Sequence, residues 1–307
     1  MKLKIKKWDP RTLSPTSTIL LVGKRGTGKS TLLKEICYWF AQTGKINLAI
    51  GMSPTEESSE NLGSFLPPCM IHTEYNETAV KELLETQKRQ WKRGHGSNVL
   101  LLLDDVCYDK SVLRSKTIRQ LFMNGRHRRC GLILCMQYVL DMPPDLRSNI
   151  DVCLALRDNI HSSREKLWKN FFGFFATYGE FSKVMDACTE NFEALTYANN
   201  VSPTNNIEDS VFWYKANPTT PAFRLGDPVY WKLHNRYYHD REDEFDDIAM
   251  KQDRAKKLRD GKIEEVEKNT STTASMAVMQ TCKLPTAPVK GKIRGRKHHT
   301  QLPQLYQ

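Results

Sequence analysis

The sequence predicts an α/β fold in which an open, mainly parallel sheet is flanked by helices. A glycine-rich loop at residues 23–30 joins an apolar run at residues 18–22 to a helical pattern at residues 31–40, which is the order of elements in a phosphate-binding unit. Residues 99–103 are all apolar, as expected of a central parallel strand covered on both faces. Strands then alternate with helices, which favours right-handed crossovers within one parallel sheet.

Hydrophobic periodicity and turn residues predict the elements between these landmarks. Residues 46–50 predict a second strand, and the polar stretch at residues 53–60 predicts the loop after it. Apolar residues at helical spacing predict a helix over residues 77–93 that stops at Gly94. The other elements expected in this half are a short strand near residues 70–71, a helix over 113–123, and strands over 132–136 and 152–156.

The second half of the chain has a weaker pattern. It predicts helices over residues 163–175 and 181–193 and short strands over 194–197 and 211–214. We expect the aromatic cluster at residues 171–175 in the core or in a subunit contact. Near the C-terminus, residues 290–299 form a basic run that fits a solvated tail, a DNA-contacting arm or a nuclear-import signal.

Composition limits the class of protein. The 307 residues are 39% hydrophobic and 26% charged, which is enough to bury a substantial core. A formal charge of +11 favours a polyanionic partner such as nucleic acid. Neither a membrane-spanning run nor a signal stretch is visible, so we expect a soluble intracellular protein. The eight cysteines form no C-x-x-C pair, and we interpret them as reduced core thiols, with a metal site or disulfide framework as the alternative.

The loop at residues 23–30, called the phosphate loop below, predicts nucleotide binding. Gly23 and Gly28 let backbone N–H groups turn toward a phosphate, Lys29 reaches the β- and γ-phosphates, and Ser30 supplies a hydroxyl for Mg²⁺. The predicted ligands are therefore ATP and Mg²⁺. A glycine-rich turn beside a surface lysine is the alternative. The residues expected to contact the nucleotide are Gly23, Lys24, Arg25, Gly26, Thr27, Gly28, Lys29, Ser30 and Thr31.

Three polar residues follow predicted strands at the edge where parallel sheets bind ligands. Asp104 and Asp105 end the strand at residues 99–103, and we expect Asp104 to hold Mg²⁺ and Asp105 to polarise the attacking water. An N-cap pair is the alternative for the two acids. Gln137 follows the strand at residues 132–136, and its amide can donate to the γ-phosphate while accepting from the water.

Arginines near this strand are candidates for stabilising the transferred phosphoryl group, often from a neighbouring subunit. Arg126 is the first choice, and Arg147 is the second. Arg128 and Arg129 lie in the same segment as Arg126, and a surface or DNA-contacting charge is the alternative for these three arginines. His127 has no visible metal partner, so we interpret it as a packing or hydrogen-bonding residue.

Taken together, the motifs resemble those of the genome-packaging ATPases of nucleocytoplasmic large DNA viruses and their polinton and virophage relatives, within the FtsK–HerA superfamily. The resemblance covers about residues 18–157. It rests on the phosphate loop, the two acids, the segment at residues 124–127, Gln137 and the segment at residues 146–151. Many members of the superfamily carry Glu where this chain has Asp105.

The resemblance implies an additional-strand P-loop NTPase core, in which the strand before Gln137 lies between the other two motif-bearing strands. It also implies a homo-oligomeric ring, hexameric or pentameric, that drives double-stranded DNA into a preformed capsid and therefore contacts a capsid or portal component. The implied location is the virion or a viral factory in the host cytoplasm, and the basic tail leaves the nucleus open. Lys110, Arg114 and Lys116 are candidate DNA contacts or simply solvent-facing charges.

Three parts of the chain are expected. They are a short N-terminal arm at residues 1–17, a P-loop ATPase domain at residues 18–240 with its motif-bearing core at 18–157, and a charged, disordered tail at residues 241–307. Two other functional classes use the same phosphate loop: a small-molecule P-loop kinase and a non-packaging nucleotide-binding adaptor. The kinase needs neither the acid pair nor the strand-end glutamine, and the guanine-reading N-K-x-D pattern of GTPase switches is absent.

Overall fold

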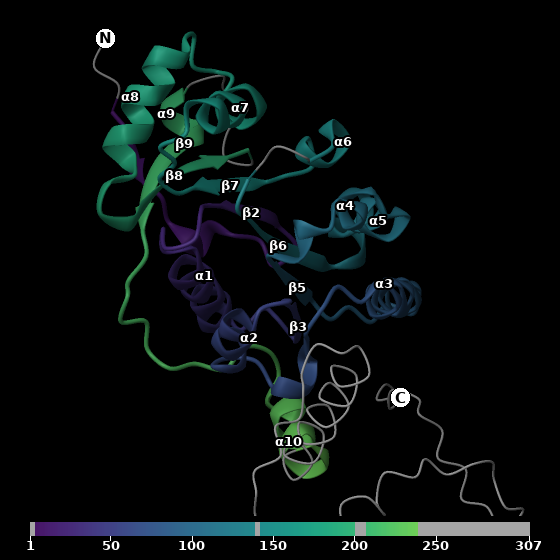
Figure 1. Cartoon of the computed structure of the whole chain (residues 1–307). Helices are drawn as coiled ribbons and strands as arrows, with labels where there is room; N and C mark the ends of the chain where they lie inside the picture. Colours follow the sequence, from purple (N-terminus) through teal and green to yellow (C-terminus); the bar gives the residue numbers. More distant parts are fainter. Residues whose placement is uncertain (1–3, 139–141, 200–206, 239–307) are drawn as a thin grey trace, which may run out of the picture. The chain divides into compact units, whose positions relative to one another are not determined.

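A single mixed sheet organises the protein. The structure is a computed structural model and describes residues 4–138, 142–199 and 207–238. Within these residues the strand order is β1-β9-β8-β7-β2-β6-β5-β3-β4 (Figure 1). The strands are β1 (Lys6–Lys7), β2 (Thr18–Val22), β3 (Leu48–Met52), β4 (Ile71–His72), β5 (Val99–Asp104), β6 (Cys130–Met136), β7 (Val152–Ala155), β8 (Glu193–Ala198) and β9 (Val211–Lys215).

Most strand pairs are parallel, which confirms the expected fold class. Strand β6 lies between β2 and β5, so the position predicted for the strand before Gln137 is also confirmed. Among the described strands, only the β7–β8 and β8–β9 pairs are antiparallel. Two helices, α7 (His161–Phe171) and α8 (Tyr178–Cys188), separate β7 from β8 and contact each other. Because they return the chain to the edge it left, β8 runs back against β7.

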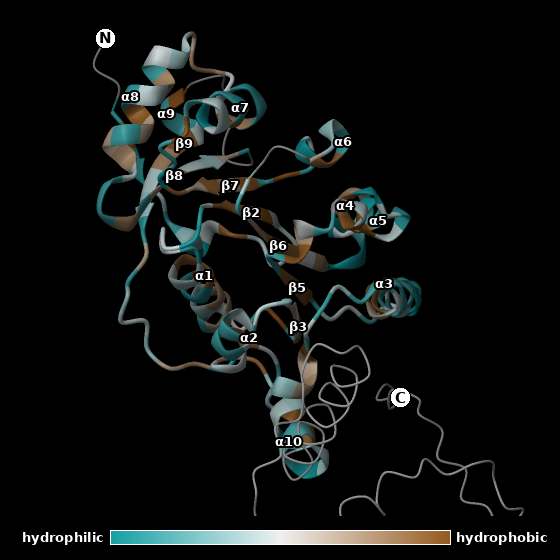
Figure 2. Cartoon of the chain, viewed as in Figure 1, coloured by the Kyte–Doolittle hydropathy of each residue, from teal (hydrophilic) through white to brown (hydrophobic). Residues whose placement is uncertain are grey.

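Helices cover both faces of the sheet. Alternate side chains of a strand point to opposite faces, so Ile19 and Leu21 join one core and Leu20 and Val22 join the other. The first core includes α1 (Lys29–Thr43) and α2 (Glu56–Gly63). The second includes α3 (Glu77–Lys92), α5 (Lys116–Asn124), α6 (Pro144–Arg147), α7 and α8. Figure 2 shows hydrophobic strands between helices whose outer faces are hydrophilic.

Several expected elements differ from the structure. The polar stretch expected as a loop contains α2, whose first turn carries Glu56 and Glu57, where carboxylates favour the positive end of a helix. The helix expected over residues 113–123 is two helices, α4 (Lys110–Arg114) and α5, because the Ser115 hydroxyl caps α5 by accepting from the Ile118 amide at 3.1 Å. The helix expected over residues 181–193 ends at Cys188.

The described cysteines and the aromatic cluster match their predictions. The cluster is core, since Phe171, Phe172 and Phe175 are all buried. Five of the described cysteines, Cys37, Cys130, Cys135, Cys153 and Cys188, are buried thiols, and burial raises the pKa of Cys130 to about 12. No helix in the described part of the chain is long and apolar enough to cross a membrane. The basic run at residues 290–299 and the tail at 241–307 lie outside the described residues.

The segment at residues 216–227, called the strap below, links the two ends of the sheet. It leaves β9, crosses the face covered by α1, and reaches the short helix α10 (Pro228–Tyr237) (Figure 1). The Asn217 amide donates to Glu35 Oε2 of α1 at 2.8 Å. At the other end the Leu225 amide donates to the Phe65 carbonyl at 3.0 Å, and the Asp227 amide donates to the Asn47 carbonyl at 2.8 Å.

Asp151 secures the start of β2. It is buried, its Oδ2 accepts from the Thr18 amide at 2.9 Å, and its Oδ1 accepts from the Arg126 guanidinium. We expect Asp151→Ala to lower the free energy of unfolding by about 2 to 3 kcal/mol, because a partly buried amide and a guanidinium lose their acceptor. Urea unfolding measures this loss. The exposed Glu165, which pairs with Lys169, provides the control: Glu165→Ala should cost less than about 0.5 kcal/mol, and equal losses would contradict the assigned role.

Candidate nucleotide site

The phosphate loop joins β2 to α1 at the carboxyl edge of the sheet. The Gly23 amide donates to the Met136 carbonyl of β6 at 3.0 Å. A Cβ on Gly23 would lie 2.6 Å from Thr27 Oγ1 and 2.7 Å from Leu156 Cδ1, so this position has no room for a side chain. Gly28 has φ of 92°, in the left-handed region that glycine adopts without strain. The glycines of the motif are therefore required by this backbone.

The loop delivers the start of α1 to the site. Gly28 is the N-cap, no side chain caps this end, and the first turn holds no acid. Free backbone N–H groups and the positive end of the helix dipole make such a terminus suited to a phosphate group. Ser30 is exposed in this first turn, whereas the loop itself is held by the Thr27 hydroxyl, which donates to the Lys24 carbonyl at 2.7 Å.

Lys29, Asp105 and Gln137 form one connected cluster. The buried Lys29 ammonium donates to Asp105 Oδ1, and Gln137 Nε2 donates to Asp105 Oδ2 at 3.3 Å. Each side chain comes from a different strand end: Lys29 follows β2 through the loop, Asp105 follows β5 and Gln137 follows β6. Asp105 itself has φ of 53°, an uncommon backbone conformation for a residue with a side chain.

Asp104 is buried beside this cluster. Its side chain is 1% exposed, and neither carboxylate oxygen has a hydrogen-bond partner of normal geometry among the described residues. Burial raises the pKa of Asp104, while the Lys29 charge and weak contacts with Ser58 and Cys135 oppose that rise. Buried carboxylates without partners are rare in proteins. The two oxygens of Asp104 without partners therefore fit a Mg²⁺ ion, which prefers oxygen ligands.

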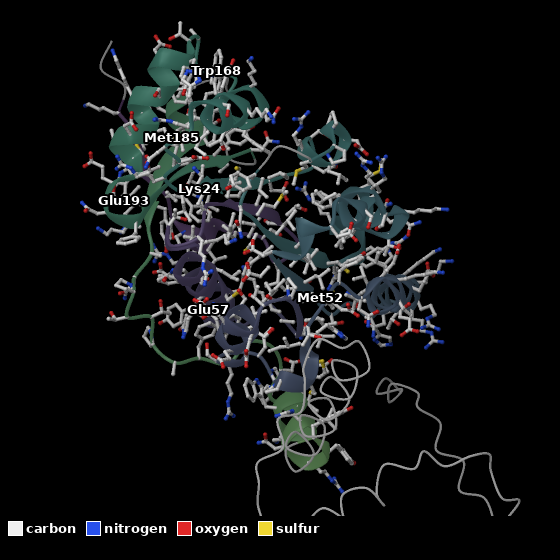
Figure 3. The ribbon with its side chains drawn as sticks, viewed as in Figure 1. Lys24, Met52, Glu57, Trp168, Met185 and Glu193 are labelled. Atoms are coloured by element: carbon white, nitrogen blue, oxygen red, sulfur yellow. The ribbon has the colours of Figure 1, made fainter. Side chains whose placement is uncertain are left out.

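Two basic residues of the phosphate loop form ion pairs with acids outside the loop. Lys24 Nζ donates to Asp158 Oδ1 at 2.5 Å, and Arg25 Nη2 lies 3.4 Å from Glu57 Oε2 in an exposed pair. Figure 3 labels Lys24 and Glu57. Asp158 was not identified from the sequence. Its position was a usable signal, since an acid just past the end of β7 lies at the same sheet edge as Asp104 and Gln137.

Arg126 is not part of this cluster within one chain. Its guanidinium binds Asp151, next to Thr18 at the start of β2, while the phosphate loop begins at the other end of that strand. The length of β2 separates the two positions by about 13 Å. Because the Arg126 side chain is 59% exposed, it remains available to a second molecule.

The other candidate arginines have different surroundings. Arg129 donates to the Gly96 carbonyl at 2.7 Å, and its guanidinium lies 5.4 Å from the ring centroid of Trp91. Arg128 is half-buried, and its Nη1 has no partner among the described residues. Arg147 is half-buried at the end of α6, and His127 is exposed. Of the four arginines, Arg126 has the most open setting.

Comparison with known proteins agrees with the motifs. The model of the family described as Poxvirus A32 protein matches residues 11–170. The chain belongs to this family. Uncharacterized protein 088R of Invertebrate iridescent virus 3 is 35% identical over 214 residues, covering 68% of this chain and 80% of the relative. An uncharacterized protein of Acanthamoeba polyphaga mimivirus is 29% identical over 248 residues, covering 78% of this chain and 85% of the relative. The resemblance to proteins of large DNA viruses is thus confirmed.

Among solved structures, the genome packaging NTPase B204 from Sulfolobus turreted icosahedral virus 2, in complex with AMP, is similar to this member of the A32 family. It is 18% identical with a TM-score of 0.49, and the match covers 67% of this chain and all of that one.

The buried charge at Asp104 has a measurable cost. We expect Asp104→Asn to raise the free energy of unfolding of the metal-free protein at neutral pH by about 1 kcal/mol, because the amide carries no charge. The folded-state pKa of Asp104 lies above its unfolded value, so ionisation destabilises the fold. The advantage of the variant should therefore shrink as pH falls through the pKa of Asp104. Urea unfolding at several pH values measures it.

The exposed Asp186 supplies the matched control for this prediction. Asp186→Asn removes the same charge without relieving burial, and it should give no gain in stability. A gain that is as large at acidic pH as at neutral pH would contradict the role assigned to the Asp104 charge.

Proposed function

We propose that this protein is a DNA-dependent ATPase that translocates double-stranded viral DNA into a preformed capsid. The observation that carries the proposal is the contact of Lys29 and Gln137 with Asp105, the neighbour of the buried Asp104. A phosphate-binding helix terminus, two strand-end acids and a strand-end amide together suit hydrolysis of a phosphoanhydride by water. The resemblance of these motifs to those of packaging ATPases supports DNA translocation into a capsid as the process that this hydrolysis drives.

The Lys29–Asp105 pair suggests how ATP engages the site. Lys29 is paired with Asp105, so ATP must draw the ammonium toward its β- and γ-phosphates. Asp105 is then free to accept a hydrogen bond from the attacking water and to polarise it. Gln137 already reaches Asp105, which places its amide to orient the same water and to donate to the γ-phosphate.

Ser30 and Asp104 would hold Mg²⁺ in this site. When bound, the ion neutralises phosphate charge and polarises the phosphoryl group. Asp104 fits this role because its oxygens are buried and open, and Ser30 fits because its hydroxyl is exposed in the first turn of α1.

The proposed assembly is a homo-oligomeric ring, hexameric or pentameric, with ATP bound between subunits. Arg126 is the proposed arginine finger in trans, since it lies too far from the phosphate loop of its own chain to act there. The surplus of positive charge suits contacts to DNA phosphates, which carry no sequence information and so serve a motor that must move any sequence. Candidate contacts are Lys110, Arg114 and Lys116.

A capsid or portal component is the other proposed partner. The proposed location is the virion or a viral factory in the host cytoplasm, with the host nucleus as the alternative that the basic tail leaves open. The DNA-dependence of turnover is the property that separates this proposal from a kinase or an adaptor.

ATP turnover should depend on long double-stranded DNA. We expect phosphate release to increase when DNA is added and the increase to fall steeply as salt rises, because salt weakens contacts to phosphates. A rate of ATP turnover that does not change when DNA is added would contradict the proposed motor function.

Lys29→Ala should lower turnover at least about 100-fold, because the charge on the transferred phosphoryl group loses its cation. Lys34→Ala removes a charge from the same helix outside the loop and should leave turnover nearly unchanged.

Mixing experiments test Arg126. Arg126→Lys keeps a cation for Asp151 but loses the planar fork, and it should poison wild-type subunits more than in proportion to its share of the mixture. Phosphate release across a mixing series measures this effect, with unfolding temperature confirming that the variant is folded. Arg119→Lys, at an exposed pair with Asp145, is the control. Activity that falls only in proportion to dilution would argue against a role in trans.

A further inference from the structure

An aromatic ring lies against the phosphate loop. Phe192 follows α8 and directly precedes β8, and Figure 3 labels its neighbour Glu193. A Cβ placed on Gly28 would lie 3.4 Å from Phe192 Cδ1 and 3.6 Å from its Cβ, so the side chain packs on the backbone at the start of α1. Even so, Phe192 is 68% exposed. A large apolar side chain is thus left in water beside the candidate nucleotide site.

The backbone beneath this ring is strained. Asn191 has φ of 48° and Phe192 has φ of 64°. Asparagine enters the left-handed region with some ease, but a bulky aromatic residue there is an outlier. Burial in the core does not explain the conformation, because the ring is exposed. Strained residues of this kind concentrate at ligand-binding sites.

The sheet order places Phe192 on a definite side of the loop. Strands β6 and β5, which carry Gln137 and the two acids, lie on one side of β2, while β7 and β8 lie on the other. If the γ-phosphate faces Asp105 and Gln137, the phosphate chain runs across the start of α1 toward β7 and β8. The base of a bound nucleotide then emerges on the side where Phe192 covers Gly28.

We propose that Phe192 is a nucleobase-stacking residue that completes the nucleotide site. This inference rests on the proposed function, because it requires a nucleoside triphosphate in the phosphate loop. The ring covers one face of the base, and the base in turn covers the apolar surface that the free protein exposes. Stacking recognises a π-face that every base possesses, so Phe192 gives affinity for the base without choosing between adenine and guanine.

Two probes separate contacts to the base from contacts to the phosphates. Magnesium ATP carries both, whereas magnesium tripolyphosphate carries only the phosphate chain. In the full-length protein, we expect Phe192→Ala to weaken ATP binding about 10-fold and to leave tripolyphosphate binding unchanged. Phe192→Trp should retain ATP affinity because it preserves a stacking surface. Tyr237→Ala, which removes another exposed aromatic ring on α10, should change neither affinity. Calorimetric titration measures all of these values.

The outcomes distinguish the inference from the function on which it rests. If the wild-type protein binds neither probe, the proposed function fails. If the wild type binds both probes and Phe192→Ala weakens both equally, the ring only supports the loop and the stacking role is wrong. The same conclusion follows if Phe192→Ala binds ATP as tightly as the wild type, which would leave the ring to another partner such as a neighbouring subunit.

Discussion

The register of three parallel strands is the constraint on which the site depends. Strand β6 pairs with β2 on one side and with β5 on the other, and parallel strands end at a common edge. The phosphate loop, Gln137 and the acid pair therefore meet without any long connection to bring them together. A shift of one residue would turn each strand's side chains to the opposite face, and the buried apolar residues on both faces of these strands prevent that shift.

The parts of the fold that were predictable are those in which one physical signal dominates. The strand ending at Asp104 is fully apolar, and the phosphate loop has little conformational freedom, so both follow from residue types. Helix α2 did not, because its polar sequence conceals Leu62 as its one buried residue. The return of β8 against β7 depends on the packing of α7 and α8. Phe192 was also invisible to sequence reasoning, since its place beside Gly28 comes from the route of the chain and not from a motif.

The candidate site contains buried charged groups that add little to the stability of the fold. Asp104 is buried with no hydrogen-bond partner of normal geometry in the described part of the chain, and Lys29 is buried with an acid as its counter-ion. A buried pair of this kind contributes little net stability, because desolvation of the charges offsets their attraction. Both groups fit the proposed site, in which Mg²⁺ would pair with Asp104 and the phosphates of a nucleotide would pair with Lys29. The Arg126–Asp151 pair differs, since Asp151 also binds the backbone of β2 and so joins a candidate intermolecular contact to the sheet itself.

In the proposed motor, the strap would determine how a mechanical load reaches the sheet. Tension applied at the end of α10 would meet the backbone hydrogen bonds of Leu225 to Phe65, which follows α2, and of Asp227 to Asn47, which precedes β3. The Asn47 side chain adds a further bond to Asp227 at 3.3 Å. The load is thus taken up near the far end of the sheet and does not peel β9 from β8. Strands β2, β6 and β5 lie between these ends. The strap therefore connects the two sides of the sheet without crossing the strand ends that form the candidate site.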